Sequence, residues 1–167
     1  MKALALIVLA ACATTAPVSR PVDRGQLAKI EASVDTAGTP VGTSEGATLV
    51  IVFASWCGHC HAELEVLAKL RPAHPALRVL GVNYRGHEEY KERGSSDAVQ
   101  SYVATHAPWL RVVPADDALF SALGSPPKIP TLYVFDRSGT LVQVYSRTER
   151  AMPDGEELGK LLRRIGV

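Results

Sequence analysis

Short runs of apolar, mostly β-branched residues alternate along this chain with stretches in which apolar residues recur every three or four positions. The run Thr48–Ala54 is almost unbroken, which is typical of a strand buried on both faces of a sheet. Similar runs predict further strands at Leu77–Val82, Leu110–Val113, Thr131–Phe135 and Thr140–Tyr145. Turn residues at 136–139 join the last two runs and predict a β-hairpin.

Apolar residues at helical spacing predict helices over 62–70, 97–106, 116–123 and 156–165. Asp97 is suited to cap the second of these helices, and Gly124 to end the third. The first strand, first helix and second strand form a βαβ unit, whose crossover makes the two strands parallel, whereas the hairpin adds antiparallel strands. The predicted fold class is therefore α/β, with one mixed sheet and helices on both of its faces.

The first residues of the chain have the character of an export signal. Lys2 precedes a short apolar run, so we expect a signal peptide over residues 1–11, too short to span a bilayer. Leu9-Ala10-Ala11-Cys12 resembles the lipobox of bacterial lipoproteins, which implies cleavage before Cys12 and its acylation. An ordinary signal with an A-x-A site at 11–13 is the alternative, and both interpretations export the protein.

Residues 12–46 are rich in Thr, Pro, Gly and Ser, and we predict a tether and N-terminal segment there, followed by one domain over 47–167. Leu27, Ile30 and Val34 share helical spacing, which allows a short helix within this segment. Residues 83–96 are polar, which predicts a solvated loop or frayed helix. The net charge of +1 gives no indication of a nucleic-acid partner, and we expect a monomer.

The motif Cys57-Gly58-His59-Cys60 lies where the first predicted strand passes into the first predicted helix. Cys60 follows Cys57 by one helical turn, so the two sulfurs are within disulfide reach. Cys57 falls at the positive end of the helix dipole, where a thiol ionises more easily. A thiolate is the nucleophile of thiol–disulfide exchange, so the motif predicts a redox-active disulfide and no other cofactor or metal.

The same residues allow two other interpretations. Cys57-Gly58-His59-Cys60-His61 also fits the C-x-x-C-H pattern of c-type haem attachment, with His61 as axial ligand and a c-type electron carrier as the alternative function. A zinc site is weaker, since two cysteines and one histidine lack an obvious fourth ligand. In the redox interpretation, His61 is expected on the exposed side of the first helical turn.

Three stretches together resemble the thioredoxin superfamily: Val52–Cys60, Ile129-Pro130-Thr131-Leu132 and Phe135–Gly139. The interval between the first two is similar to the TlpA/ResA-like branch of exported, membrane-tethered thiol–disulfide oxidoreductases. The resemblance implies a thioredoxin-like sheet, an attacking Cys57 and a resolving Cys60. It also implies a cis bond between Ile129 and Pro130 that faces the dithiol.

Further roles follow from the resemblance and from the local chemistry. Glu63 occupies a position that is often acidic in this branch, and we expect it to exchange a proton with Cys60. Trp56 is expected to shield the dithiol and to shape the surface that meets a partner. The pair Gly58-His59 matches the dipeptide of protein disulfide isomerases, and a protonated His59 would stabilise the Cys57 thiolate. Ile51 stands where thioredoxins keep a buried acid.

The sequence therefore predicts a thiol–disulfide oxidoreductase of the bacterial cell envelope, lipid-anchored and facing the periplasm. Its expected partners are the thiols and disulfides of exported proteins and a membrane dithiol electron donor. The branch resemblance favours a reductase, with apocytochrome cysteines as candidate substrates, whereas His59 favours an isomerase or a dithiol oxidase. A thioredoxin-fold binding module without catalysis is a further alternative.

Overall fold

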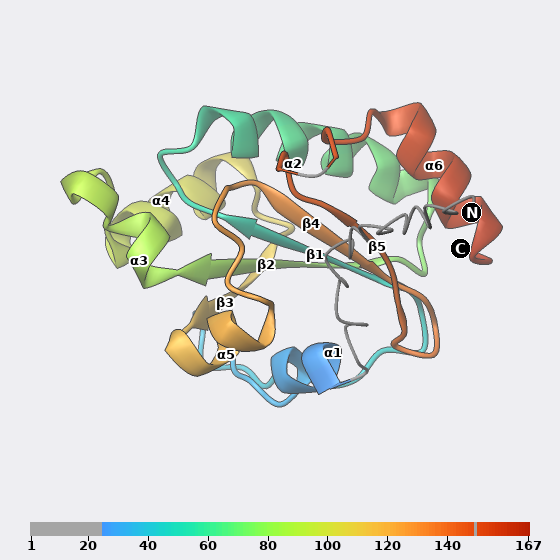
Figure 1. The fold of residues 1–167 in the computed structure, drawn as a ribbon, viewed down its shortest axis with the longest axis horizontal. Helices are drawn as coiled ribbons and strands as arrows, with labels where there is room; N and C mark the ends of the chain where they lie inside the picture. Colours follow the sequence, from blue (N-terminus) through green and yellow to red (C-terminus); the bar gives the residue numbers. More distant parts are fainter. Residues whose placement is uncertain (1–24, 149) are drawn as a thin grey trace, which may run out of the picture.

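A five-stranded mixed sheet with the order β3-β2-β1-β4-β5 forms the centre of the protein (Figure 1). The computed structural model describes residues 25–148 and 150–167, so the predicted signal peptide and Cys12 lie outside the described residues. The strands are β1 (Thr48–Phe53), β2 (Arg78–Tyr84), β3 (Arg111–Ala115), β4 (Thr131–Phe135) and β5 (Leu141–Tyr145). Each predicted strand is present, and the α/β class is confirmed.

The pairing of β1 brings three parts of the chain to one edge of the sheet. β1 is parallel to β2, with Phe53 opposite Asn83, and antiparallel to β4, with Val52 opposite Thr131. The carboxyl ends of β1 and β2 therefore meet the amino end of β4. All six residues of β1 are buried, as its unbroken apolar sequence predicts.

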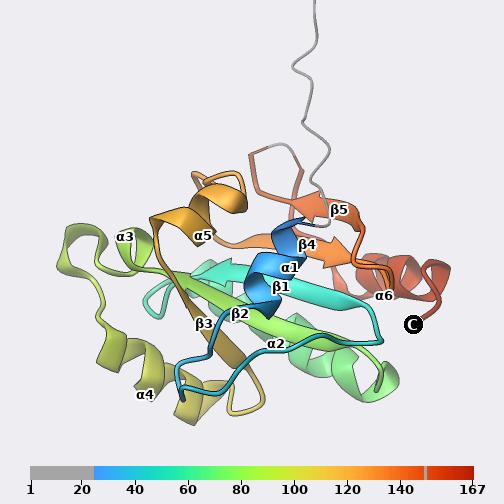
Figure 2. The same cartoon turned by 90° about the horizontal axis from the view of Figure 1, so that it is seen from below.

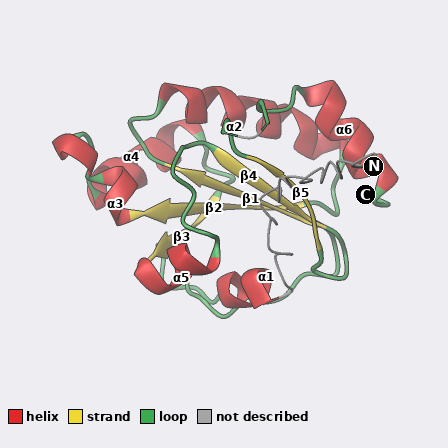
Figure 3. Cartoon of the chain, viewed as in Figure 1, coloured by secondary structure: helices red, strands yellow, loops and turns green. Residues whose placement is uncertain are grey.

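Helices cover both faces of the sheet, and Figures 1 and 3 show α2 and α6 on the side opposite α1 and α5. One face carries α2 (Gly58–Leu70), α4 (Ser96–His106) and α6 (Gly155–Arg164), whose buried residues share one apolar core. The other carries α1 (Gly25–Glu31) and α5 (Asp117–Ala122), which lie in front of the sheet in Figure 2. Shorter pieces are η1 (Arg71–Ala73), α3 (Arg85–Glu88) and η2 (Tyr90–Glu92).

Capping side chains define where the helices begin. The Asp116 side chain accepts a hydrogen bond from the N–H of Leu119 at the start of α5. At the start of α4 the cap is Ser95, whose hydroxyl accepts from the N–H of Ala98, whereas the sequence predicts Asp97. Capping by a serine two residues earlier lengthens the helix by two residues, and Asp97 then lies in the first turn, where its charge suits the helix dipole.

The segment before β1 contains the short helix that the spacing of Leu27 and Ile30 allows. Residues 25–31 form α1, and the side chains of Leu27, Ile30 and Val41 are buried against the sheet. Asp35 is buried as well, and its carboxylate accepts hydrogen bonds from Arg111 of β3 at 3.0 and 2.8 Å. Hydrogen bonds from the N–H of Thr39 and from Arg111 lower the pKa of Asp35.

Residues 25–46 thus form an outer layer of the domain. The sequence predicts a tether and N-terminal segment here, and the buried side chains of Leu27, Ile30 and Val41 attach residues of this segment to the sheet. Within the ranges 25–148 and 150–167, no helix has both the length and the apolar character needed to cross a membrane.

Replacing Ile30 by alanine tests whether this layer stabilises the fold. Ile30 is fully buried, so we expect Ile30→Ala to lower the free energy of unfolding by about 2–5 kcal/mol. Val34 is 50% exposed, and Val34→Ala should change stability by less than about 0.5 kcal/mol. Urea unfolding of both variants measures this, and equal small effects would mean that the segment is only a linker.

Candidate active site

Cys57 is the N-cap of α2, directly after the loop that leaves β1. Its backbone is extended, and its sulfur accepts a hydrogen bond from the N–H of Cys60 at 3.2 Å. A disulfide joins Cys57 to Cys60, whose Cα atoms are 5.2 Å apart. The Cys57 sulfur therefore lies where the unpaired N–H groups of a 13-residue helix favour negative charge, as the sequence predicts.

The two cysteines differ slightly in exposure. Cys57 keeps 5% of its surface exposed, whereas Cys60 has none. The small exposed part of the pair therefore belongs to Cys57. This order of access suits an attacking Cys57 and a resolving Cys60.

Glu63 is the buried acid of α2. It lies three residues after Cys60, hence one turn further along the same side of the helix, and it is only 4% exposed. Its Oε1 atom is buried and has no hydrogen-bond partner. Burial raises the pKa of Glu63 to about 7. A carboxyl group with this pKa can accept or release a proton at neutral pH, which is what a general acid–base group requires.

A cavity of about 500 Å³ adjoins Glu63 and the start of α2. Its lining combines α2 residues with the chain that leads from β5 to α6: His59, Ala62, Glu63, Val66, Arg147, Thr148, Arg150, Ala151 and Met152. His59 itself is exposed. The predicted charge-bearing histidine and the predicted proton-exchanging glutamate therefore line one cavity.

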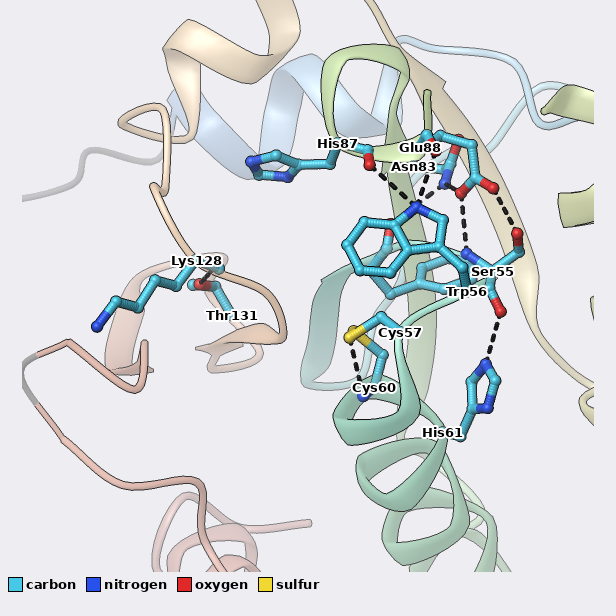
Figure 4. Close-up of a disulfide and its surroundings, with 11 residues drawn as sticks. Ser55, Trp56, Cys57, Cys60, His61, Asn83, His87, Glu88, Lys128 and Thr131 are labelled. Carbon is cyan, nitrogen blue, oxygen red and sulfur yellow. Dashed lines mark hydrogen bonds between the residues drawn. A yellow bond between two sulfur atoms is a disulfide. The ribbon is translucent and has the colours of Figure 1, made fainter. Parts of the chain in front are cut away.

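Trp56 and His61 hold the motif to its surroundings (Figure 4). The Trp56 indole donates to the carbonyl oxygen of Glu88 at 2.8 Å, and the Arg93 guanidinium lies 5.0 Å from its ring centre. The expectation that His61 is exposed on the first turn is wrong. Its Nε2 lies 2.7 Å from the carbonyl oxygen of Ser55, and its ring stacks on Tyr102 at 4.2 Å, because α4 packs beside α2 there.

The second predicted motif reaches the same edge of the sheet from β4. The Ile129–Pro130 peptide bond is cis, as the resemblance implies. Pro130 is buried, and Ile129 packs against the apolar core that contains both cysteines. The Thr131 hydroxyl donates to the carbonyl oxygen of Lys128 at 2.7 Å and so ties this loop to the start of β4. The structure thus places both predicted motifs at the same edge of the sheet.

Three residues at this edge were not identified from the sequence: Ser55, Asn83 and Glu88. The prediction for 83–96 is a solvated loop or frayed helix, and the short helices α3 and η2 are present there, but Glu88 is not solvated: it is 2% exposed and accepts hydrogen bonds from Ser55 and Asn83. A polar Asn directly after a buried strand was an available indication, because the carboxyl ends of parallel strands meet at one edge. Nothing in the local sequence distinguishes Glu88 from the other charged residues around it.

Comparison with solved structures places the chain among thioredoxin-like folds. No family model matches the chain, and no curated protein matches it either. A secreted disulfide oxidoreductase of Mycobacterium tuberculosis, described as homologous to E. coli DsbE, is 20% identical, with a TM-score of 0.63 over 79% of this chain and 93% of that one.

Two further structures give the same result. A thiol:disulfide interchange protein of the thioredoxin family from Chlorobium tepidum is 20% identical, with a TM-score of 0.64 over 80% of this chain and 91% of that one. StoA from Bacillus subtilis is 17% identical, with a TM-score of 0.58 over 77% and 92% of the two chains. These likenesses confirm the predicted thioredoxin-like fold.

The buried carboxyl group of Glu63 should make stability depend on pH. Its pKa is higher in the folded protein, about 7 against an ordinary 4.5, so the fold holds a proton that the unfolded chain releases. Stability should therefore fall as pH rises from about 4.5 to 7, by roughly 3 kcal/mol. Glu63→Gln should remove this loss, so that the variant exceeds the wild type in stability at pH 8 and matches it at pH 4.

Urea unfolding of the oxidised protein at both pH values measures the effect. Glu65→Gln is the matched control, because Glu65 is exposed on the same helix. A wild-type stability that does not fall over this interval would contradict the raised pKa.

Proposed function

We propose that this protein is a thiol–disulfide oxidoreductase whose nucleophile is Cys57. The observation that carries the proposal is the placement of Cys57 as the cap of α2, bonded to Cys60, with the buried carboxyl group of Glu63 one helical turn beyond Cys60. A thiolate at a helix N-terminus, a second thiol one turn away and a proton-exchanging group are the components that disulfide exchange needs. The names of the structures that share its fold support the same chemistry.

In the reducing direction the Cys57 thiolate attacks one sulfur of a substrate disulfide. An S–S bond forms between Cys57 and the substrate, and the other substrate sulfur leaves as a thiolate. Cys60 then gives its proton to ionised Glu63 and attacks the Cys57 sulfur, which releases the second substrate thiolate. Two electrons pass to the substrate, and the Cys57–Cys60 disulfide is left to be reduced by a dithiol donor. The reverse sequence oxidises a substrate dithiol.

We propose that the substrates are exported proteins. The predicted signal peptide and the secreted M. tuberculosis protein of the same fold support export. Lipidation of Cys12, a position facing the periplasm and a membrane dithiol donor are proposed on the sequence alone. Reduction of apocytochrome cysteines is proposed on the resemblance of the motifs to the TlpA/ResA-like branch. Gly58-His59 supports isomerase or oxidase activity as the alternative within the same chemistry.

The position of His61 disfavours the alternative of a c-type haem carrier. That alternative needs the His61 ring as an axial ligand. Here the ring nitrogen is within hydrogen-bond distance of the Ser55 carbonyl oxygen, and the ring face is stacked on Tyr102. Attachment of haem to both sulfurs would also require the disulfide to be absent and these contacts to break. A binding module without catalysis has no need of the buried acid beside the dithiol.

Trapping of a mixed disulfide tests the proposed function. In a Cys60→Ser variant the substrate should remain bonded to Cys57, because no resolving thiol is left, and the adduct should appear on non-reducing gels with a model disulfide protein. The matched Cys57→Ser variant should trap at least about tenfold less, since Cys60 is fully buried. Equal trapping by the two variants, or no adduct with either, would contradict the assignment.

The reduction potential tests the role of His59. An imidazolium beside the Cys57 thiolate stabilises the reduced form and so raises the potential, which we expect at about −230 to −150 mV, near that of disulfide isomerase. His59→Pro and His59→Gln should both lower the reduction potential. His106 is exposed at the end of α4, so His106→Gln should leave the potential unchanged. Titration against glutathione at one pH measures these values. A wild-type potential at or below about −270 mV that the substitutions leave unchanged would show that His59 does not set the potential.

A further inference from the structure

The carboxylate of Glu88 is buried and fully hydrogen-bonded beside the redox motif. It belongs to the last residue of α3, only 2% of its surface is exposed, and it lies on the opposite side of the motif from α2. Its Oε2 atom accepts hydrogen bonds from the N–H of Ser55 at 2.9 Å and from Asn83 Nδ2 at 2.8 Å. Its Oε1 atom accepts from the Ser55 hydroxyl.

The main chain of the same residue holds Trp56. The indole N–H donates to the carbonyl oxygen of Glu88 at 2.8 Å and to that of His87 at 3.2 Å (Figure 4). Side chain and backbone of Glu88 therefore bind the two residues that immediately precede Cys57. Every one of these contacts crosses more than 30 positions of sequence, so the loop after β1 takes its conformation from the segment after β2.

Two further contacts fix Glu88 itself. Asn83 Nδ2 also donates to the carbonyl oxygen of Phe53 at 3.2 Å, so the amide connects the carboxylate to the end of β1. Gly94 passes so close to Glu88 that a Cβ atom there would overlap its Oε1. The carboxylate thus occupies a site that is closed on the side of Gly94 and lined by donors on the other.

The two buried glutamates of this edge have opposite surroundings. Glu63 has a carboxyl oxygen without a partner and adjoins a cavity, which suits proton exchange. Glu88 has a donor on each oxygen, which suits a fixed geometry. A buried charge is costly unless it is fully bonded, and here all of its side-chain donors come from Ser55 and Asn83.

We propose that Glu88 is a positioning residue, which holds Ser55 and Trp56 so that the sulfur of Cys57 stays at the N-terminus of α2. The inference rests on the proposed function, because positioning matters for a Cys57 that acts as a nucleophile. The stabilisation of a thiolate by a helix terminus falls off within one turn, so it depends on where the sulfur lies. When the hold is released, the thiolate loses part of this stabilisation and the pKa of Cys57 rises.

Alkylation of Cys57 measures this directly and needs no disulfide substrate. In the full chain with Cys12→Ala and Cys60→Ser, Cys57 is the single remaining cysteine. The rate of reaction with iodoacetamide against pH then gives the midpoint of its ionisation. Two variants are compared in this background, Glu88→Ala and Glu88→Gln. The glutamine oxygen can accept from Ser55 N–H and Asn83, while its amide donates to the Ser55 hydroxyl, so Glu88→Gln removes the charge and keeps the hydrogen bonds.

We expect the midpoint to rise in Glu88→Ala by about one pH unit or more, toward the ~8.5 of a free thiol, and to stay unchanged in Glu88→Gln. An unchanged midpoint in a folded Glu88→Ala protein would overturn the proposal. So would an equal downward shift in both variants, which would show that the negative charge acts on the thiolate and that geometry does not.

If Glu88→Ala does not fold, the same measurement is made on a second variant. The double variant Ser55→Ala with Asn83→Ala removes two of the three hydrogen bonds and keeps the carboxylate, and an unshifted midpoint there would also overturn the proposal. The outcome is separate from that of the trapping experiment. A shifted midpoint without any mixed disulfide would refute the proposed function and leave the positioning role of Glu88 standing. A mixed disulfide together with an unshifted midpoint would support the proposed function and refute the positioning role.

Discussion

The site depends on one constraint, the pairing of β1 with a parallel strand on one side and an antiparallel strand on the other. This pairing brings the carboxyl ends of β1 and β2 together with the amino end of β4. The redox motif follows β1, the carboxylate of Glu88 follows β2, and Pro130 precedes β4. Three segments far apart in the sequence therefore meet at one edge without any long loop to connect them. The same edge is where ligands bind in other open α/β sheets.

Around the disulfide, the protein uses two glutamates in different ways. Burial without a partner keeps the proton of Glu63 available near neutral pH, at a cost in stability when it is lost. Both carboxylate oxygens of Glu88 accept hydrogen bonds, and these bonds fix the position of its buried side chain. The difference lies in the elements around them. Glu63 lies on a helix and adjoins an open cavity, whereas Glu88 lies between the ends of two strands that both carry hydrogen-bond donors.

Strands and helices with continuous or periodic apolar patterns could be predicted from the sequence, because burial on a sheet or helix face leaves that pattern. The pair Cys57 and Cys60 could be found for a similar reason, since spacing alone places them one turn apart. A short helix around Leu27 and Ile30 could be predicted from their spacing, but its attachment to the domain could not, since the Asp35–Arg111 ion pair joins positions far apart in the sequence. Glu88 was missed because Asn83 lies five positions away, and Ser55 lies 33 positions away and becomes a neighbour only when β1 and β2 pair.

Assignment of residues 25–46 to the folded domain shortens the part of the chain available to connect it to a membrane. With the anchor proposed at Cys12, only the stretch up to Gly25 remains, which spans at most about 45 Å at ~3.3–3.6 Å per residue. That is little more than the diameter of a domain of this size, roughly 30–40 Å. The dithiol would then be confined to a thin layer next to the bilayer and would not move through the whole periplasm. Partners held in the same membrane would then meet it at a high local concentration.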